Sequence, residues 1–159
     1  MYHNIFDSHA HYDDEQFETD RNELLVSFKD KGVSGVVCCG VNIPTSEFAV
    51  ELSHKYDFVY SAVGFHPLDN DEYRDGDLER IKELAQDEKC VAIGEIGLDY
   101  HYEKESRENQ LILLEKQIQL ANELDLPVIF HDRESHEDTL NILKKYKPKG
   151  VLHCFSGSV

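Results

Sequence analysis

Basic residues are scarce in this 159-residue sequence: 16 Lys and Arg stand against 32 Asp and Glu, which gives a formal net charge of −16 at pH 7. Contact with nucleic-acid phosphates normally needs clustered Lys and Arg, so this balance argues against a basic nucleic-acid footprint. The acidic composition does not exclude a small acidic pocket that holds divalent cations. Such cations reverse the sign of the local charge and let phosphate approach. The alternative is a solvated acidic surface, which we expect for the segment 69–77.

Long apolar runs and targeting signals are also missing. No run is long enough to cross a bilayer, and the N-terminus lacks a basic segment followed by an apolar one. We therefore expect no membrane association and a cytoplasmic location. The four cysteines form no Cys-x-x-Cys pair, and three of them lie in apolar runs. We expect reduced, buried thiols at Cys38, Cys39, Cys90 and Cys154.

Repeats, linkers and low-complexity segments are absent, so we expect residues 1–159 to form a single domain. Six short apolar runs alternate with five amphipathic stretches. The runs predict strands at 4–9, 34–40, 58–64, 90–97, 126–132 and 150–157. The amphipathic stretches predict helices at 19–32, 45–56, 76–87, 106–124 and 135–146.

This alternation predicts an α/β fold with a parallel sheet. Several of the runs are continuously apolar, as expected when both faces of a sheet are covered. A doubly wound open sheet and a TIM-type (β/α)8 barrel both fit this pattern. No Gly-x-Gly-x-x-Gly motif or P-loop follows the first run, which counts against a nucleotide-binding sheet.

Histidine or glutamate stands at or near the ends of five of the predicted strands: His9, His11, His66, Glu95, His131 and His153. Parallel strands all end on the same side of a sheet, and in a barrel that rim is the active-site face. Imidazoles and a carboxylate converging there would be costly to bury without a partner, and a divalent metal satisfies them. In the His-x-His pair both side chains point the same way, because side chains along a strand alternate with a period of two.

Imidazole and carboxylate ligands suit Zn, Mn, Fe, Co or Ni, and mixed sites also accept Mg. The two oxygens of Glu95 could bridge two ions. A pair of metal ions can hold a hydroxide between them and stabilise a phosphoryl transition state. The pattern therefore predicts a divalent-metal hydrolase site at the rim.

Five motifs in this order and spacing closely resemble the TatD family of metal-dependent hydrolases: FDSHAH, GFHP, GEIGLDY, PVIFHDR and HCFSG. GEIGLDY and HCFSG are specific, whereas His-x-His alone is shared by the wider amidohydrolase superfamily. The resemblance runs the whole length of the chain. It implies a TIM barrel, present here as a partial barrel of about six parallel strands with their helices. It also implies a divalent-metal deoxyribonuclease that removes nucleotides from the 3′ ends of DNA strands.

By position, the resemblance implies two divalent ions, whose identity is left open among Mg, Mn, Zn, Ni, Co and Fe. His9, His11 and Glu95 would hold one ion. Glu95, His131 and His153 would hold the other, with Glu95 bridging the pair. Phosphotriesterase-like relatives usually place a carboxylated lysine at the bridging position, so a glutamate there favours the TatD interpretation.

Four further residues would stand beside the ions. The resemblance puts His66 in contact with substrate phosphate, which makes Glu95 and His66 the expected catalytic residues. Asp7 would orient a histidine, or else serve as a cap or turn residue. Asp99 and Arg133 would either contribute to the site or form salt bridges at the rim.

The sequence stops just after the sixth predicted strand, whereas a family barrel has eight strands and ~250 residues. The family's strand-eight aspartate, which binds the first metal and orients the attacking water, has no counterpart here. The sequence leaves three explanations open: a fragment of a longer protein, a short protein that closes its edges against another chain, or a modified sequence. Unpaired strand edges and exposed interior side chains predict that the isolated chain self-associates.

Three functions remain in competition. The first is a metal-dependent phosphodiesterase acting on DNA ends. The second is another amidohydrolase-type reaction on an ester, lactone or amide, because the same metal chemistry serves many substrates. The third, favoured by the missing aspartate, is a shortened chain that binds metal without turnover. The remaining histidines are expected to be solvated: His3, His54, His101 and His136.

Overall fold

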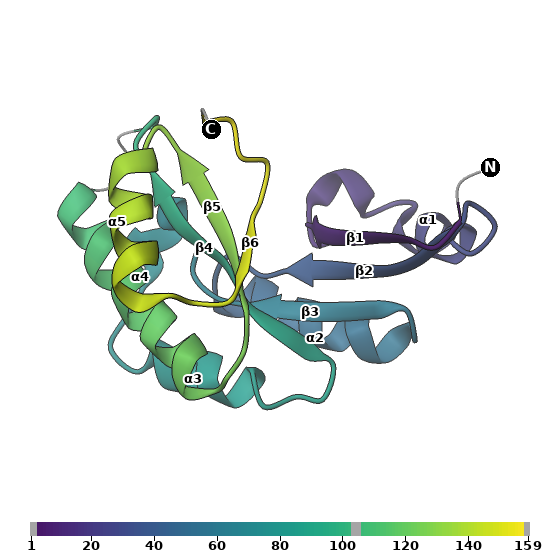
Figure 1. The fold of residues 1–159 in the computed structure, drawn as a ribbon. Helices are drawn as coiled ribbons and strands as arrows, with labels where there is room; N and C mark the ends of the chain where they lie inside the picture. The colour runs from purple at the N-terminus through teal and green to yellow at the C-terminus, as the bar shows by residue number, and fades with distance from the viewer. Residues whose placement is uncertain (1–2, 103–105, 158–159) are drawn as a thin grey trace.

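The computed structural model describes residues 3–102 and 106–157, in which strands and helices alternate along the chain (Figure 1). The strands are β1 (Ile5–Ala10), β2 (Val33–Cys39), β3 (Val59–Val63), β4 (Cys90–Asp99), β5 (Val128–Arg133) and β6 (Gly150–Leu152). The α-helices are α1 (Arg21–Ser27), α2 (Ile43–Lys55), α3 (Asp77–Leu84), α4 (Arg107–Glu123) and α5 (His136–Tyr146). Two 3-10 segments, η1 (Glu15–Phe17) and η2 (Pro67–Glu72), follow β1 and β3.

The six strands form one parallel sheet in which each strand pairs with its neighbours in sequence, in the order β1-β2-β3-β4-β5-β6. A doubly wound sheet would reverse its strand order at a switch point, so sequential order excludes that alternative. The sheet twists and curls from β1 to β6 (Figure 1). The expectation of a partial TIM-type barrel of six parallel strands is therefore confirmed.

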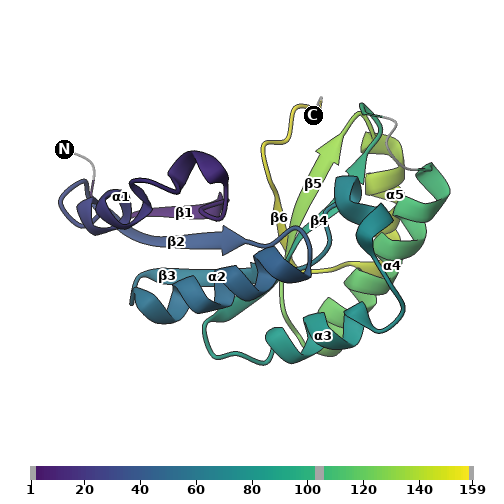
Figure 2. The same ribbon diagram turned by 180° about the vertical axis from the view of Figure 1, so that it is seen from behind.

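The helices pack on the outer face of this curled sheet. Seen from behind, α2 lies in front of β3, with α3 below the strands and α4 to the right of β4 (Figure 2). The main core lies between them and β3 to β5, and its fully buried side chains include Ile93, Ile96, Leu114 and Ile118. The amphipathic stripes read from the sequence are thus the faces that these helices bury.

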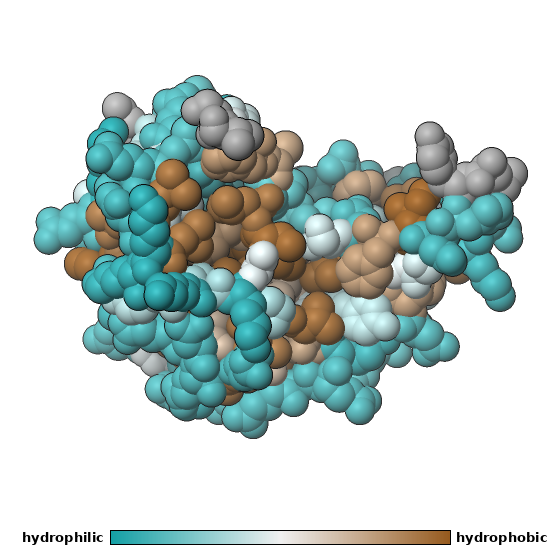
Figure 3. Space-filling view, in the orientation of Figure 1, coloured by the Kyte–Doolittle hydropathy of each residue, from teal (hydrophilic) through white to brown (hydrophobic). Residues whose placement is uncertain are grey.

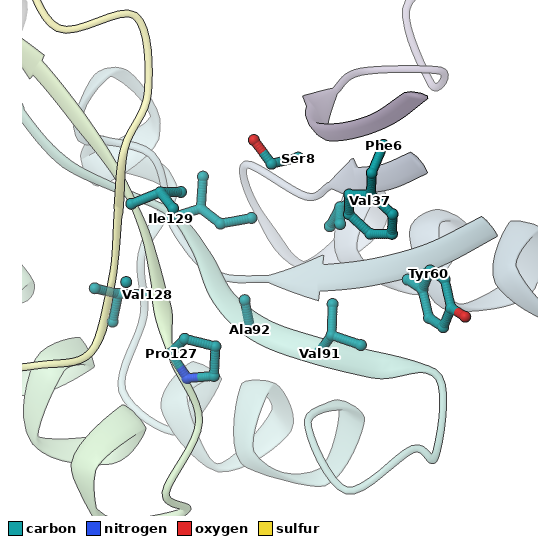
Figure 4. Close-up of a pocket in the computed structure, with 11 residues that line it drawn as sticks. Phe6, Ser8, Val37, Tyr60, Val91, Ala92, Pro127, Val128 and Ile129 are labelled. Carbon is teal, nitrogen blue, oxygen red and sulfur yellow. The ribbon is translucent and has the colours of Figure 1, made fainter. Parts of the chain in front are cut away.

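The inner face of the sheet is apolar and open. All six strands contribute to a hollow of about 290 Å³, and its lining includes Phe6, Val37, Ala92, Ile129 and Val151. Figure 3 shows apolar side chains gathered over this face, and Figure 4 shows them pointing into the hollow. None of the strand-end histidines lines it, so this apolar hollow and the polar rim are separate features.

Two element ends differ most from the sequence expectation. The sixth strand ends at Leu152 rather than at 157, because Cys154 has a φ of 47° and turns the chain out of the extended conformation. Helix α1 ends at Ser27, and the following residues form turns up to Gly32, whose φ is 82°. Cys38, Cys39 and Cys90 are buried as expected, whereas Cys154 is exposed in the turn that follows β6.

Among the described residues, no helix combines the length and apolar character needed to cross a membrane.

Candidate metal centre

The carboxyl ends of the strands bring the singled-out side chains together. His9 lies in β1 and His11 one residue beyond it, while Glu95 lies in β4 and His131 in β5. Gly97 lets β4 and β5 approach closely, because it is paired with His131 and a Cβ there would lie 1.9 Å from the His131 carbonyl oxygen. The second glycine of GEIG is thus required by the strand pairing that sets Glu95 beside His131.

Glu95 is the centre of the cluster. Its residue surface is only 3% exposed, and three imidazoles surround its carboxylate. Oε2 lies 2.9 Å from Nε2 of His9 and 3.2 Å from Nε2 of His11, while Oε1 lies 3.1 Å from Nδ1 of His131. A buried carboxylate is stable only when such partners replace its lost hydration.

The second nitrogens of the histidines are held by the surrounding structure. Nδ1 of His11 donates to the Cys39 carbonyl at 3.0 Å, which leaves Nε2 as the nitrogen that faces Glu95. Nε2 of His131 lies 2.9 Å from Oδ2 of Asp99, a fully buried carboxylate. Partners of this kind fix the orientation and tautomer of metal-binding histidines in proteins.

His66 is held in a different state from its neighbours. It is 8% exposed, and its ring packs edge-on against His131 with centroids 4.4 Å apart. Its Nδ1 accepts a hydrogen bond from the Leu68 N–H at 3.2 Å. A neutral His66 must therefore carry its proton on Nε2, which makes that nitrogen a donor. Burial lowers the pKa of His66 to about 4, so the ring is neutral at pH 7.

In the metal-free chain, Glu95 and the histidines that contact it shift one another's pKa values. Burial alone would raise the pKa of Glu95, but hydrogen bonds from His11, His131 and His9 outweigh it and hold that pKa far below its usual range. Burial likewise disfavours charge on His11 and His131, yet the hydrogen bond that each makes to Glu95 raises its pKa. His153 has a lowered pKa because of burial and the neighbouring His9.

His153, Asp7 and Arg133 are placed less centrally. The His153 ring stacks on His9 with centroids 3.6 Å apart, and its backbone N–H donates to the Phe130 carbonyl at 2.8 Å. Asp7 accepts a hydrogen bond from the backbone N–H of His9 at 3.1 Å and so acts on the main chain rather than on the ring. Arg133 is exposed at the rim, where its guanidinium lies 4.8 Å above the Tyr102 ring.

Two groups of described side chains bring ligand atoms within 4.8 Å of one another: His9, His11 and Glu95, and His66, Glu95 and His131. Glu95 is common to both, and imidazole with carboxylate is a donor set that divalent transition metals accept. The residues present therefore fit divalent metal ions. The second group contains His66 where the family resemblance implies His153, whose ligation stays a prediction.

Sequence reasoning missed two glutamines of α4. Gln110 and Gln117 are each 1% exposed and bind the main chain at the ends of β4 and β3. The sequence analysis singled out only the apolar residues of this helix. The signal available was their spacing of seven, which puts them on one stripe with Leu114 and Ala121.

The other histidines lie at the surface, as expected, but three of them pair with carboxylates. Nitrogen–oxygen distances are 2.7 Å for His54 and Asp87, 2.8 Å for His101 and Glu134, and 2.7 Å for His136 and Asp132. Of these acids, Asp132 is buried.

Comparisons with known proteins agree with this arrangement. The family model described as TatD related DNase matches residues 6–159. A Bacillus subtilis protein named uncharacterized metal-dependent hydrolase YabD is 43% identical over 157 residues, which cover 97% of this chain and 62% of that protein. The 3'-5' ssDNA/RNA exonuclease TatD of Erwinia tasmaniensis is 36% identical over 158 residues, which cover 97% of this chain and 61% of that enzyme.

A solved structure shows the same fold. The crystal structure of YJJV, a TatD homolog from Escherichia coli, superposes with a TM-score of 0.91 at 33% sequence identity. The match covers 97% of this chain and 61% of that one. The chain thus spans about three fifths of the length of the curated relatives and of the solved structure that it matches.

Proposed function

The chain belongs to the TatD family of metal-dependent hydrolases. From this membership we propose that the rim cluster, formed by His9, His11, His66, Glu95 and His131, hydrolyses phosphodiester bonds at the 3′ ends of DNA strands. The observation that supports this most directly is the buried Glu95 carboxylate, which is shared by His9, His11 and His131. Three imidazoles and a carboxylate form a donor set that divalent transition metals accept.

The proposed ligands are His9, His11 and Glu95 for one divalent ion, and Glu95, His131 and His153 for a second. Such ions supply a coordinated water of lowered pKa and neutralise the charge of the attacked phosphate. Their number and identity, among Mg, Mn, Zn, Ni, Co and Fe, are part of the proposal. The chain's own contribution is to hold the imidazoles in place, with His11 fixed through the Cys39 carbonyl.

His66 is proposed to contact the substrate rather than to act as a ligand. Its Nδ1 is occupied by the Leu68 N–H, and its ring is neutral at pH 7 because burial lowers its pKa to about 4. A neutral ring with its proton on Nε2 can donate a hydrogen bond to a phosphate oxygen without adding a charge to the site. This assignment keeps Glu95 and His66 as the catalytic residues.

Asp99 and Arg133 lie opposite each other on β4 and β5, and each is proposed to support the site in a different way. Asp99 orients His131 through the 2.9 Å contact between Oδ2 and Nε2. Arg133 presents a cation at the exposed rim, backed by the Tyr102 ring, which is itself 56% exposed. In so acidic a chain, a guanidinium near the rim cluster is suited to bind a phosphate of the strand being cleaved.

Single-stranded nucleic acid is the proposed substrate class, because relatives of this chain are named 3'-5' ssDNA/RNA exonucleases. The test is release of nucleotides from 3′-ended single-stranded DNA and RNA in Mg²⁺ or Mn²⁺, with ester and lactone substrates assayed in parallel. The control is the double variant His9→Ala/His11→Ala. The parent chain is expected to release nucleotides, and the control variant is expected to lose this release. Metal binding without release of any product above the control would refute the proposed activity.

The apolar inner face supports a second proposal, that copies of this chain associate. Phe6 is 55% exposed and Val151 46% exposed on that face, around the open hollow. Exposed patches of this kind drive association in water. Light scattering is expected to show species larger than one chain, and a monodisperse monomer would contradict the proposal.

A further inference from the structure

Helix α4 carries two buried carboxamides that bind main chain next to the rim cluster. Oε1 of Gln110 accepts the Asp99 N–H at 2.8 Å, and Nε2 of Gln110 donates to the Asp99 carbonyl at 2.8 Å. Oε1 of Gln117 accepts the Phe65 N–H at 2.7 Å, and Nε2 of Gln117 donates to the Phe65 carbonyl at 3.0 Å. Each amide therefore makes the same paired contact with the N–H and carbonyl of one residue.

These contacts are made at the carboxyl ends of two neighbouring strands, β3 and β4. Phe65 lies two residues beyond the end of β3, and Asp99 is the last residue of β4. Buried main-chain N–H and carbonyl groups at such positions need partners from elsewhere. Gln110 and Gln117, each 1% exposed, supply both partners at each place.

The two bound residues lead directly to the rim cluster. The Asp99 side chain contacts Nε2 of His131 at 2.9 Å, so its main chain sets where that contact is made. His66 follows Phe65, and its own N–H donates to the Val41 carbonyl at 2.9 Å. The peptide that enters His66 is therefore held on one side by α4 and on the other by the segment after β2.

A spacing of seven residues puts the two glutamines on the same face of α4, two helical turns apart. One rigid helix of 17 residues thus fixes the end of β3 relative to the end of β4. His66 comes from the first end, and Asp99, which contacts His131, comes from the second. We propose that Gln110 and Gln117 are positioning residues, which set the relative places of His66 and the Asp99–His131 pair.

The test replaces each amide with a side chain of similar length that has no amide donor or acceptor, in Gln110→Met and Gln117→Met. Gln119→Met is the matched control, because Gln119 is exposed on the same helix and donates only weakly, at 3.3 Å, to the Tyr146 hydroxyl. The first measurement is the imidazole ¹H–¹⁵N NMR spectrum of the metal-free chain. Gln110→Met is expected to shift the signals of His131, Gln117→Met those of His66, and Gln119→Met neither.

The second measurement is Mn²⁺ affinity by electron paramagnetic resonance, and it rests on the proposed function. Loss of a group that orients metal ligands costs about tenfold in affinity or more, so each of the two buried variants is expected to bind Mn²⁺ at least about tenfold more weakly. A parent chain that binds no Mn²⁺ would refute the proposed metal site, while the metal-free histidine spectra would still decide the positioning role.

A structural role alone would give a different result. Folded variants with reduced stability but with the parent's histidine signals and Mn²⁺ affinity would overturn the inference. If the methionine variants do not fold, Gln110→Asn and Gln117→Asn keep the amide but shorten the side chain by one methylene, so that the amide no longer reaches both main-chain groups. These variants are expected to show the same histidine-specific shifts, and spectra like that of the parent would likewise overturn the inference.

Discussion

His66 gives the most quantitative prediction, because its protonation is coupled to folding in the metal-free chain. Burial lowers its pKa from 6.5 to about 4. Between these two values the unfolded chain binds a proton that the folded chain does not, so the free energy of unfolding must fall as the pH falls. The perturbation is His66→Asn, whose carbonyl oxygen can still accept the Leu68 N–H that Nδ1 now binds.

The size of the effect follows from the two pKa values. At pH 7 the ring is neutral in both states and contributes nothing to the pH dependence. At pH 5 the unfolded ring is protonated and the folded ring is not, which costs about 2 kcal/mol of stability at 1.36 kcal/mol per pKa unit. His66→Asn removes this loss. His11 and His131 act in the opposite direction, since their raised pKa values stabilise the fold below pH 6.5.

The assay is urea unfolding in EDTA at pH 7 and pH 5, for the parent chain and for His66→Asn. The contributions of the other histidines occur in both chains and cancel to first order in the comparison. Between pH 7 and pH 5, the parent is expected to lose about 2 kcal/mol more stability than the variant. Equal losses in the two chains, within a few tenths of a kcal/mol, would show that burial does not hold His66 neutral.

Three other substitutions test the site and its support. Asp99→Asn should lower Mn²⁺ affinity about 10–100-fold, because the carboxylate facing Nε2 of His131 becomes an amide; unchanged affinity in a paramagnetic resonance titration would contradict this role. Arg133→Ala should slow cleavage of single-stranded DNA while leaving Mn²⁺ affinity intact, and loss of both together would argue against a contact with substrate. Gly97→Ala should lower the free energy of unfolding by about 1–3 kcal/mol, because its Cβ would meet the His131 carbonyl at 1.9 Å; a urea midpoint like that of the parent would be inconsistent with this strand pairing.

The fold was predictable from the sequence because every strand and every helix carries its own apolar pattern. Alternation of the two element types requires parallel pairing, and the structure adds the sequential strand order that distinguishes a barrel from a doubly wound sheet. The convergence of His9, His11, Glu95 and His131 followed from strand ends alone. In contrast, the early end of β6 depends on the turn at Cys154, which no apolar pattern indicates.

The details of the site depend on contacts that sequence spacing does not contain. The sequence could place His66 at the rim, but the hydrogen bond that fixes its tautomer comes from the turn at Leu68. The stacking of His153 on His9 depends on how the chain leaves β6. The buried glutamines of α4 were missed because a polar residue on a helix is usually solvated, and only the packing of α4 on the sheet shows otherwise.

The histidine cluster around Glu95 is proposed to hold divalent metal. The most direct measurement is a titration of the EDTA-stripped chain with Mn²⁺, followed by paramagnetic resonance, for the parent, Glu95→Gln and the control Glu47→Gln, whose carboxylate lies exposed on α2 beside Arg80. The parent and the control are expected to bind up to two ions per chain, and Glu95→Gln is expected to lose this binding. A parent that binds no metal, or a Glu95→Gln variant that binds as the parent does, would contradict the claim.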